Sequence, residues 1–503
     1  MSNPFEHIAR DNGSQFATWK RHFSLDAMLG QRMANPLGLV VMAAMGLLLA
    51  LAIGAAGYKM GILIVLGIVG LPIILSCLFN QQIGITVSTT VSFFVLGVKR
   101  FMGDVPIGLL LDVLLLLMFM GLAIQQFRSK DWSFANNPVS YLIAFWLFYN
   151  FVELINPDAA SRMAWFYTVR GMAGVLLLYY IGLYAFSSLP FIKFTLKLFI
   201  GLSFIAALYG LKQEFIGLTN AELAWLHSDP KTFELIFQGG RIRIFSFLSD
   251  PTAYGILMTY MAMLCICLMP LNMATWKRVI LGVAAVCMLA CMAYAGTRTA
   301  YVLLPIAIFF YMILTLNRRI LIGGALFFVL GSGLMMKSTG NAVIYRIQTA
   351  FSFKEDASMK LRLMNQAYIK PFIQSHPLGG GLGSTGIWGA RFSPNSPLSK
   401  FPPDSGYVRT AVEQGWIGLL LYCTLLFVTL AIGIYQYKRL RDPDLKTVQA
   451  AILTLVFCLT FANYPQEAII LLPNSFIFYL SMAMLAKIPS LDTAPPNLLT
   501  QQS

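Results

Sequence analysis

The sequence predicts an all-α fold, a polytopic transmembrane helix bundle of about 12–14 spans with a large, partly helical extracytoplasmic loop. Three observations predict it. Of the 503 residues, 58% are hydrophobic and only 11% are charged, whereas about 25% are charged in an ordinary soluble domain. The apolar residues form long runs, as membrane-spanning helices require. The residue alternation typical of a membrane barrel is absent. A soluble enzyme, a disordered chain and a disulfide scaffold are therefore excluded.

Fourteen apolar runs have roughly the length that a membrane span needs, which is about 20 residues. They lie at 37–56, 61–79, 83–98, 105–124, 139–154, 171–188, 192–211, 252–270, 279–294, 299–316, 320–336, 416–437, 448–462 and 469–486. The third, fifth and thirteenth runs are short, so twelve or thirteen spans also agree with the pattern.

Positive charges gather in every second connection between these runs. The groups are Arg128 and Lys130, Lys193 and Lys197, Lys277 and Arg278, Arg318 and Arg319, and Lys438, Arg439, Arg441 and Lys446. Loops rich in Lys and Arg stay in the cytoplasm. The pattern therefore predicts a cytoplasmic N-terminus and places the two long connections, near 212–251 and 337–415, outside. Lys99 and Arg100 contradict it.

This topology divides the chain into seven segments. They are a cytoplasmic N-terminal segment (1–36), N-terminal transmembrane helices (37–211), a first long extracytoplasmic loop (212–251), central transmembrane helices (252–336), a large extracytoplasmic catalytic loop (337–415), C-terminal transmembrane helices (416–487) and a cytoplasmic tail (488–503). The first 36 residues are polar and lack the apolar core of a signal peptide.

Two acids fall within predicted spans, Asp112 and Glu153. An ionisable residue inside a membrane is a functional candidate by default, although an internal ion pair is the commoner outcome.

The large outer loop is expected to contain helices at 342–351 and 355–374. In the second, the residues at helical spacing form one apolar face: Leu361, Met364, Ala367, Tyr368 and Phe372. Between 337 and 405 the chain carries eight basic and three acidic residues. Outside the cell this positive charge has no topological role, so a ligand-binding surface is an alternative to a solvated basic face.

A glycine-rich stretch follows, from His376 to Gly386. It contains a Gly-x-Gly-x-x-Gly match at Gly381, Gly383 and Gly386. No strand precedes it and no βαβ unit surrounds it, which excludes a dinucleotide-binding fold. The lysine of a phosphate loop is also missing. The glycines could present backbone N–H groups to an anion, or form a tight turn that needs positive φ.

The end of the loop carries three charged residues of interest. Asp404 stands before an amphipathic stretch, where capping a helix is an ordinary role of aspartate. Arg409 and Glu413 lie four residues apart, the spacing of an ion pair on one helix face.

Three arginines lie at the outer ends of predicted spans. Arg241 and Arg243 alternate with Ile and Phe where the first long loop enters the membrane, and Arg298 joins two spans. Asp250 followed by Pro251 predicts a helix start, with a cap and then proline at the first position. A lone interfacial arginine usually anchors its helix. Three on one side predict an anion site, because guanidinium groups suit phosphate oxygens.

Four motifs in this order resemble the O-antigen ligase and polymerase superfamily of bacterial inner-membrane glycosyltransferases. They are Arg-x-Phe-Ser-x-x-Ser-Asp-Pro-Thr from Arg243, Gly-Thr-Arg-Thr-Ala from Gly296, His-Pro-Leu-Gly-Gly-Gly-Leu-Gly from His376, and Asp-Ser-Gly-Tyr from Asp404 followed by Glu-x-Gly-Trp-Ile-Gly-Leu. The resemblance covers residues from about Arg241 to Leu421.

The resemblance implies that arginines hold the pyrophosphate of an undecaprenyl-diphosphate-linked glycan while a loop residue activates the acceptor hydroxyl. The implied pyrophosphate ligands are Arg243 or Arg241, Arg298 and Arg362. The ligases carry a His where this chain has Asp404, which becomes the implied catalytic residue. The supporting candidates are His376, Gly381, Gly383, Asp250, Arg409 and Glu413. No metal or other cofactor is implied.

The resemblance further implies a metal-independent, inverting glycosyltransferase that polymerises or ligates lipid-linked oligosaccharides of the O-antigen or exopolysaccharide type. Its expected place is the bacterial inner membrane, multi-pass, with the site facing the periplasm or exterior. The implied partners are the lipid-linked donor, a glycan or lipid-linked acceptor, membrane lipids and other polysaccharide-assembly proteins, with no nucleic acid.

Ligase and polymerase remain alternatives, although Asp404 favours a polymerase or an exopolysaccharide role. A second hypothesis is a transporter or flippase of lipid-linked glycans, which would usually show repeated halves and broken helices. A third is a non-catalytic assembly partner, which leaves the clustered arginines unexplained.

Overall fold

The computed structural model describes residues 74–102, 108–238, 240–336 and 357–492, together with the isolated positions 70, 72, 344, 346–348 and 351. The chain divides into two units, residues 1–75 and 76–503, and the fold below is that of the second. The predicted spans 37–56 and most of 61–79 lie outside the described residues, as do the segment 1–36 and residues 493–503.

The described part of the chain is mainly helical and has almost no strands, which confirms the predicted fold class. In it, ten helices are long and apolar enough to cross a membrane. They are α5 (Gln81–Met102), α6 (Gly108–Ser129), α7 (Pro138–Val152), α8 (Arg162–Ala185), α9 (Leu189–Phe215), α12 (Pro251–Leu268), α13 (Thr275–Ala295), α14 (Arg298–Thr315), α19 (Gly406–Arg439) and α20 (Pro443–Ala462). Helices α15 (Arg318–Met336) and α21 (Asn474–Lys487) match two further predicted runs.

Helix α8 begins nine residues before the predicted span 171–188, after the N-cap Ser161, and it contains a charged residue that has a partner. Arg170 forms an ion pair with Asp112 of α6, with 3.1 Å between Nε and Oδ2. The second acid, Glu153, is buried and accepts a hydrogen bond of 2.7 Å from Asn156. Both acids of the predicted spans are therefore held by internal polar contacts.

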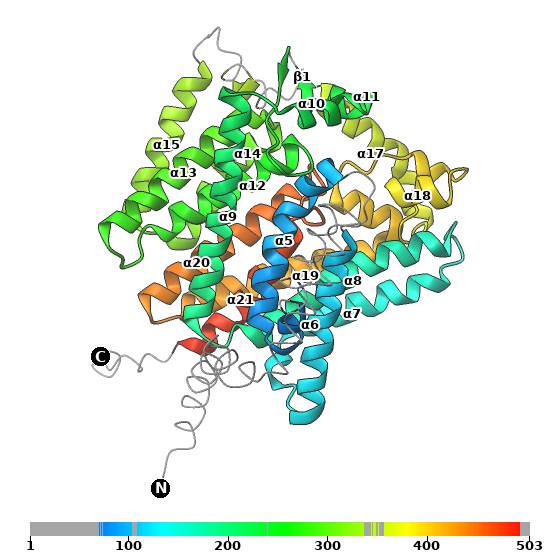
Figure 1. Cartoon of the computed structure of the whole chain (residues 1–503), viewed down its shortest axis with the longest axis horizontal. Coiled ribbons are helices and arrows are strands. Elements are labelled where there is room, and N and C mark those ends of the chain that lie inside the picture. Colours follow the sequence, from blue (N-terminus) through cyan, green and yellow to red (C-terminus); the bar gives the residue numbers. More distant parts are fainter. Residues whose placement is uncertain are drawn as a thin grey trace, which may run out of the picture. The chain divides into compact units, whose positions relative to one another are not determined.

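Helix α12 forms the centre of the bundle (Figure 1). Nearly all of its side chains are buried, and it packs against α9, α13, α14 and α20. Its sequence is apolar on every side, which is typical of a helix with no solvent- or lipid-facing surface.

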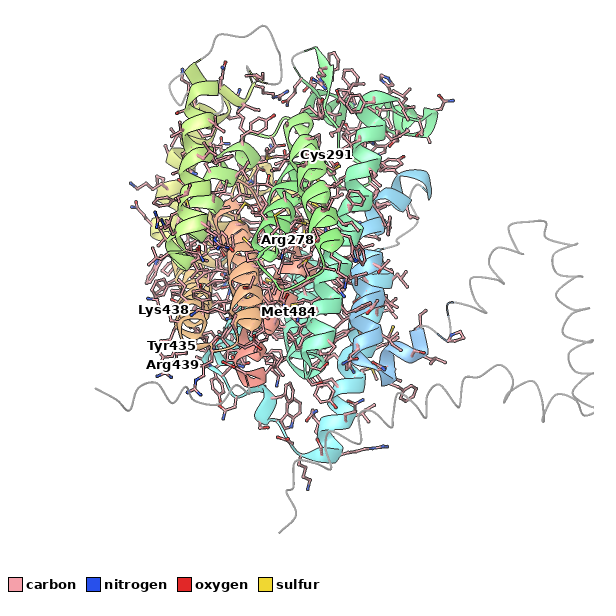
Figure 2. The ribbon with its side chains drawn as sticks, turned by 90° about the vertical axis from the view of Figure 1, so that its left-hand side faces the viewer. Arg278, Cys291, Tyr435, Lys438, Arg439 and Met484 are labelled. Carbon is pink, nitrogen blue, oxygen red and sulfur yellow. The ribbon has the colours of Figure 1, made fainter. Side chains whose placement is uncertain are left out.

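One end of the bundle joins segments that the charge pattern assigns to the cytoplasm. Lys193 pairs with Asp444 at 3.8 Å, the Asn272 N–H donates to Asp444 at 3.5 Å, and the Arg441 N–H donates to Asp492 at 2.7 Å. Figure 2 places Lys438 and Arg439 of α19 away from Cys291, which lies near the C-terminal end of α13. The predicted grouping of these connections agrees with the folded chain.

The other end, called here the hairpin end, carries the two long connections. The first contains α10 (Asn220–His227), α11 (Pro230–Ile236) and an antiparallel hairpin of β1 (Phe237–Gln238) and β2 (Arg241–Ile242). The second contains α17 (Ala357–Ser375) and α18 (Gly386–Phe392). In Figure 1, α10, α11 and β1 lie together at the top of the bundle. Arg100 also lies at the hairpin end, where it donates a hydrogen bond to the Ser246 carbonyl. It is therefore a basic residue at the end of the bundle opposite to the other basic connections.

The apolar face predicted for α17 is wrong except at Phe372. Leu361, Met364 and Tyr368 are exposed, whereas Ile369 and Phe372 pack with Val412 of α19. Both sets have helical spacing, and periodicity alone could not decide between them. The helix turns its polar residues Asn365 and Arg362, one and two turns before Ile369, toward the same side as Ile369.

Candidate active site

Arg243 is the most enclosed of the arginines that the sequence singles out. Its side chain is 5% exposed and leaves the chain just after β2. Its Nε donates to the Ala295 carbonyl at 2.8 Å, and its Nη2 donates to the Thr297 hydroxyl at 2.8 Å. These bonds tie it to the connection between α13 and α14, 52 and 54 residues further along.

Arg346 is a second cation at this place, and the sequence interpretation did not include it among the ligands. Its Nη2 donates to Gln238 Oε1 at 2.6 Å, and the same oxygen accepts from Arg243 at 3.4 Å. The guanidinium lies against Gly296, where an added Cβ would come within 3.2 Å of its Cζ. A side chain at position 296 would occupy the space of Arg346, which gives this glycine a packing role beside its positive φ of 63°.

Arg298 and Arg241 complete a cluster of four guanidinium groups. Burial lowers the pKa of Arg243 to about 10, and the positive charges of Arg346 and Arg298 contribute to this shift. Burial likewise lowers the pKa of Arg346, and the charges of Arg298 and Arg241 lower it further. Groups that repel one another in this way lie close together. We call Arg241, Arg243, Arg298 and Arg346 the arginine cluster.

Arg241 differs from the other members because it has an acidic partner. It forms an ion pair with Glu214 of α9, and its guanidinium lies 5.3 Å from the ring centre of Tyr294. Of the two arginines near the hairpin, Arg243 is thus the buried central one, and Arg241 is held at the edge.

Asp250 has the predicted capping role. Its Oδ1 accepts the N–H groups of Thr252 at 2.8 Å and Ala253 at 3.0 Å, and Pro251 is the first residue of α12. Two backbone N–H groups in the first turn of α12 therefore have a hydrogen-bond acceptor close to the arginine cluster.

Asp404 is not the cap of α19, so the capping interpretation is wrong. The N-cap is Ser405, whose hydroxyl accepts the Val408 N–H. The Asp404 carboxylate instead accepts a hydrogen bond of 3.2 Å from Asn365 of α17. Arg362 lies one helical turn before Asn365, on the same face of α17.

Arg409 and Glu413 form the ion pair that their spacing predicts, at 3.1 Å. Arg409 also pairs with Glu467 at 2.9 Å, a contact between positions 58 residues apart that no local pattern signals. Burial raises the pKa of the Glu467 carboxyl against the attraction of Arg409, and the charges of Glu413 and Asp404 raise it further. Two carboxylates therefore share one guanidinium beside Asp404.

The glycine-rich stretch is a tight turn, and the anion that it binds is the carboxylate of Glu413 from the same chain. Gly379, Gly381, Gly383 and Gly386 all have φ between 63° and 86°. The Gly383 N–H and the Thr385 hydroxyl both donate to the buried Glu413 carboxylate. The conformational interpretation of these glycines is confirmed. At Gly381 an added Cβ would lie 2.5 Å from the Ala159 Cβ, so the turn also packs closely.

His376 directly follows α17, and its side chain contacts the last turns of that helix. Its Nδ1 lies 2.8 Å from the Ser375 hydroxyl and 3.0 Å from the Phe372 carbonyl, and its ring stacks on Phe372 with 4.1 Å between centres. These contacts hold His376 against the end of α17, at the start of the glycine-rich turn.

Helix α19 bends where the site meets the membrane. Gly415 has φ 67° and ψ −175°, which separates the first turns, with Arg409 and Glu413, from the following membrane span. An added Cβ at Gly415 would lie 1.8 Å from the Pro377 carbonyl oxygen. The predicted start of this span at 416 coincides with the bend.

These features define a multi-pass membrane protein with an arginine cluster and a carboxylate-bearing loop at one end of its helix bundle. Residues 283–423 match the family model described as O-Antigen ligase. The match confirms the resemblance that the motifs predicted for this part of the chain, and it supports a membrane enzyme of the O-antigen ligase or polymerase type in general. A comparison with curated proteins finds no match.

The matched segment includes Arg298, Arg346, Arg362, Asp404 and Glu413. Arg241 and Arg243 precede it, so their assignment to the site comes from the folded contacts.

Proposed function

We propose that this chain is a glycosyltransferase that polymerises or ligates undecaprenyl-diphosphate-linked oligosaccharides at the extracytoplasmic face of the bacterial inner membrane. The observation that supports this most strongly is the arginine cluster. Three of its guanidinium groups repel one another at the hairpin end of a membrane bundle that matches the O-antigen ligase family. A diphosphate would neutralise them with bidentate contacts.

The proposed reaction is a direct displacement at the anomeric carbon of the donor glycan. The acceptor hydroxyl oxygen forms the new C–O bond while the bond from that carbon to the diphosphate oxygen breaks. The bonding electrons go to the diphosphate, whose growing negative charge Arg243, Arg298 and Arg346 stabilise. A single displacement of this kind inverts the configuration, and it needs no metal ion if the guanidinium groups carry the electrostatic role.

Asp404 is the proposed acceptor of the hydroxyl proton. Its carboxylate is not used in capping, and Asn365 orients it through one hydrogen bond. General-base assistance of this kind is typically worth about 10²- to 10⁴-fold in rate. Because Arg362 lies on α17 beside Asn365, we assign it to the acceptor side of the site.

The test is transfer activity of purified membranes supplied with lipid-linked repeat units. Wild-type membranes should lengthen or transfer the glycan, and Asp404→Asn and Arg298→Ala should abolish this while the protein remains in the membrane. Full activity in both variants would refute the assigned site. Movement of the lipid-linked glycan across vesicles, without glycan growth, would favour the flippase hypothesis instead.

Ligase and polymerase are separated by the intermediates that accumulate when the protein is deleted. Single lipid-linked repeats would indicate a polymerase. Complete polymers that remain unattached to their final acceptor would indicate a ligase.

A further inference from the structure

Residues 244–249 connect Arg243 to α12, and both ends of this segment are tied to one side chain. The Thr297 hydroxyl accepts from Arg243 Nη2 at 2.8 Å and donates to the Pro251 carbonyl at 2.9 Å. The position of Arg243 in the cluster therefore depends on the conformation of this short segment, called here the 244–249 turn.

The 244–249 turn contains a backbone conformation that side chains disfavour. Ser246 has φ 54°, in the left-handed region that glycine normally occupies. Gln213 of α9 holds it there, because its Oε1 accepts both the Phe245 N–H at 3.1 Å and the Ser246 N–H at 2.7 Å. The Ser246 hydroxyl donates to the Ala206 carbonyl at 2.9 Å.

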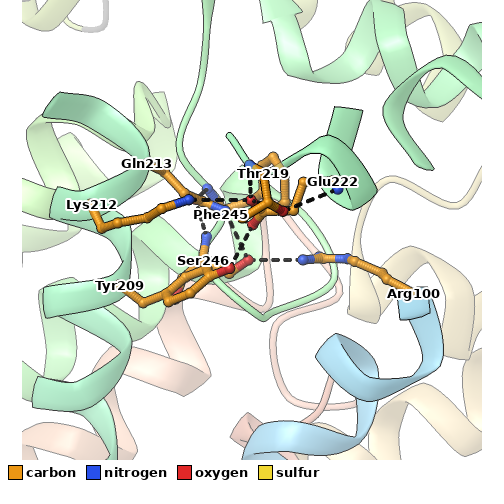
Figure 3. A network of polar contacts seen from close by, with 8 residues as sticks. All are labelled: Arg100, Tyr209, Lys212, Gln213, Thr219, Glu222, Phe245 and Ser246. Atoms are coloured by element: carbon orange, nitrogen blue, oxygen red, sulfur yellow. Dashed lines mark hydrogen bonds and ion pairs between the residues drawn. The ribbon is translucent and has the colours of Figure 1, made fainter. Parts of the chain in front are cut away.

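Glu222 of α10 in turn fixes Gln213 (Figure 3). Its Oε1 accepts from Gln213 Nε2 at 2.6 Å, and its Oε2 accepts the Thr219 N–H at 2.7 Å. Lys212 lies 3.6 Å from the same carboxylate. The amide of Gln213 is thus held in one orientation by a buried carboxylate.

Arg100 reaches the 244–249 turn from the opposite side, as Figure 3 shows. Its Nη1 donates to the Ser246 carbonyl at 2.8 Å and its Nη2 to the Ser249 carbonyl at 3.3 Å. The guanidinium lies over two neighbouring rings, 4.4 Å from the centre of Trp225 and 4.6 Å from that of Phe245. A planar, forked group that stacks on aromatic rings can make this set of contacts, and an ammonium group cannot.

We propose that Arg100 is a positioning residue of the anion site, which fixes Arg243 through the 244–249 turn. This rests on the proposed function, since the anion is the diphosphate of the donor lipid. The inference also accounts for the position of Arg100, which lies at the hairpin end against the charge pattern of the other loops. The Arg100 guanidinium there contacts two backbone carbonyls and two aromatic rings.

The test measures binding of farnesyl diphosphate, a short polyprenyl diphosphate, to the purified full-length protein in detergent. Arg100→Gln should weaken binding by about tenfold or more, because charged hydrogen bonds that hold the turn are lost. Arg100→Lys should also weaken it, since the charge stays but the two-carbonyl geometry does not. The turnover number at saturating lipid-linked donor should fall as well, because Arg243 also stabilises the charge that grows on the leaving diphosphate.

Lys99→Gln is the matched control, because it removes the same charge from the adjacent, exposed position of α5. It should bind farnesyl diphosphate like the wild type. Adding Ser246→Gly to Arg100→Gln should restore part of the affinity, because glycine adopts the positive φ without a steric penalty. The double variant also separates a loss of positioning from a general loss of folding.

Equal binding by wild type and Arg100→Gln would overturn this inference alone. So would full binding by Arg100→Lys, or an equal loss in Lys99→Gln, since either would show that charge and not geometry matters. A wild-type protein that binds no farnesyl diphosphate would overturn the proposed donor and this inference with it.

Discussion

The carboxylate of Glu413 accepts the backbone N–H of Gly383 across 3.0 Å. The acid on the first turns of α19 is therefore the anion that the glycine-rich turn binds. The same carboxylate pairs with Arg409, so one buried group joins the turn, α19 and the ion pair with Glu467.

Removing this carboxylate should destabilise the protein strongly. Glu413→Ala leaves the Gly383 N–H and the Thr385 hydroxyl without their acceptor and Arg409 with one partner fewer. Breaking a buried ion pair on one side typically costs about 3–5 kcal/mol. The melting temperature in detergent should fall accordingly, and less so for Glu413→Gln, which keeps an acceptor oxygen. An unchanged melting temperature in Glu413→Ala would contradict the described burial.

Two glycines of the turn offer a matched comparison of strain and packing. An added Cβ at Gly386 meets nothing within 4 Å, whereas at Gly383 it would lie 2.6 Å from the Ala164 carbonyl oxygen. Gly386→Ala should therefore cost only the left-handed backbone strain, about 1–2 kcal/mol. Gly383→Ala should cost clearly more, because the turn must move from α8. Thermal unfolding of both variants measures this, and equal losses would argue against close packing at Gly383.

Arg346 and Arg362 should have different kinetic roles although both are basic residues of the same loop. Arg346→Gln removes a member of the arginine cluster and should raise the KM for the lipid-linked donor by about tenfold, equivalent to about 1.4 kcal/mol. Arg362→Gln should leave the donor KM near the wild-type value and raise the KM of the acceptor. The check is steady-state kinetics with donor and acceptor varied separately. The opposite assignment of the two effects would refute the division of the site.

The pH dependence of diphosphate binding should follow the protonation of the arginine cluster. Burial and Arg346 lower the pKa of Arg243 to about 10, so this guanidinium remains charged at neutral pH. A bound anion favours the charged form. Affinity for farnesyl diphosphate should thus be constant from about pH 7 to 9 and weaken above about pH 10, with proton uptake on binding there. Binding that weakens already near pH 8 would show that another group controls it.

The helices could be predicted because a membrane span is a local property of the sequence. Every predicted run after residue 80 coincides with a helix, although some ends differ. Helix α8, for example, begins nine residues early and includes Arg170, which pairs with Asp112. The cap at Asp250 and the pair of Arg409 with Glu413 were likewise predictable, because each involves residues within one helical turn of each other.

The buried face of α17 and the role of Asp404 were not predictable in the same way. Both apolar sets on α17 have helical spacing, and only the position of α19 decides which one is covered. Asp404 and Ser405 are both good capping residues, and the contact of Asp404 with Asn365 depends on how α17 lies against α19.

The sequence by itself determined that this protein is a bundle of membrane helices with basic motifs of the O-antigen ligase type. Length, hydrophobicity and short motifs carry that information within a few tens of residues. Only the tertiary structure decided that Arg346 joins Arg243, that Glu467 shares Arg409, and that Arg100 holds the 244–249 turn. Arg100 and Ser246, for example, are 146 residues apart. Contacts of this kind arise when packed helices bring distant segments together, because buried polar groups must find partners wherever the fold places them.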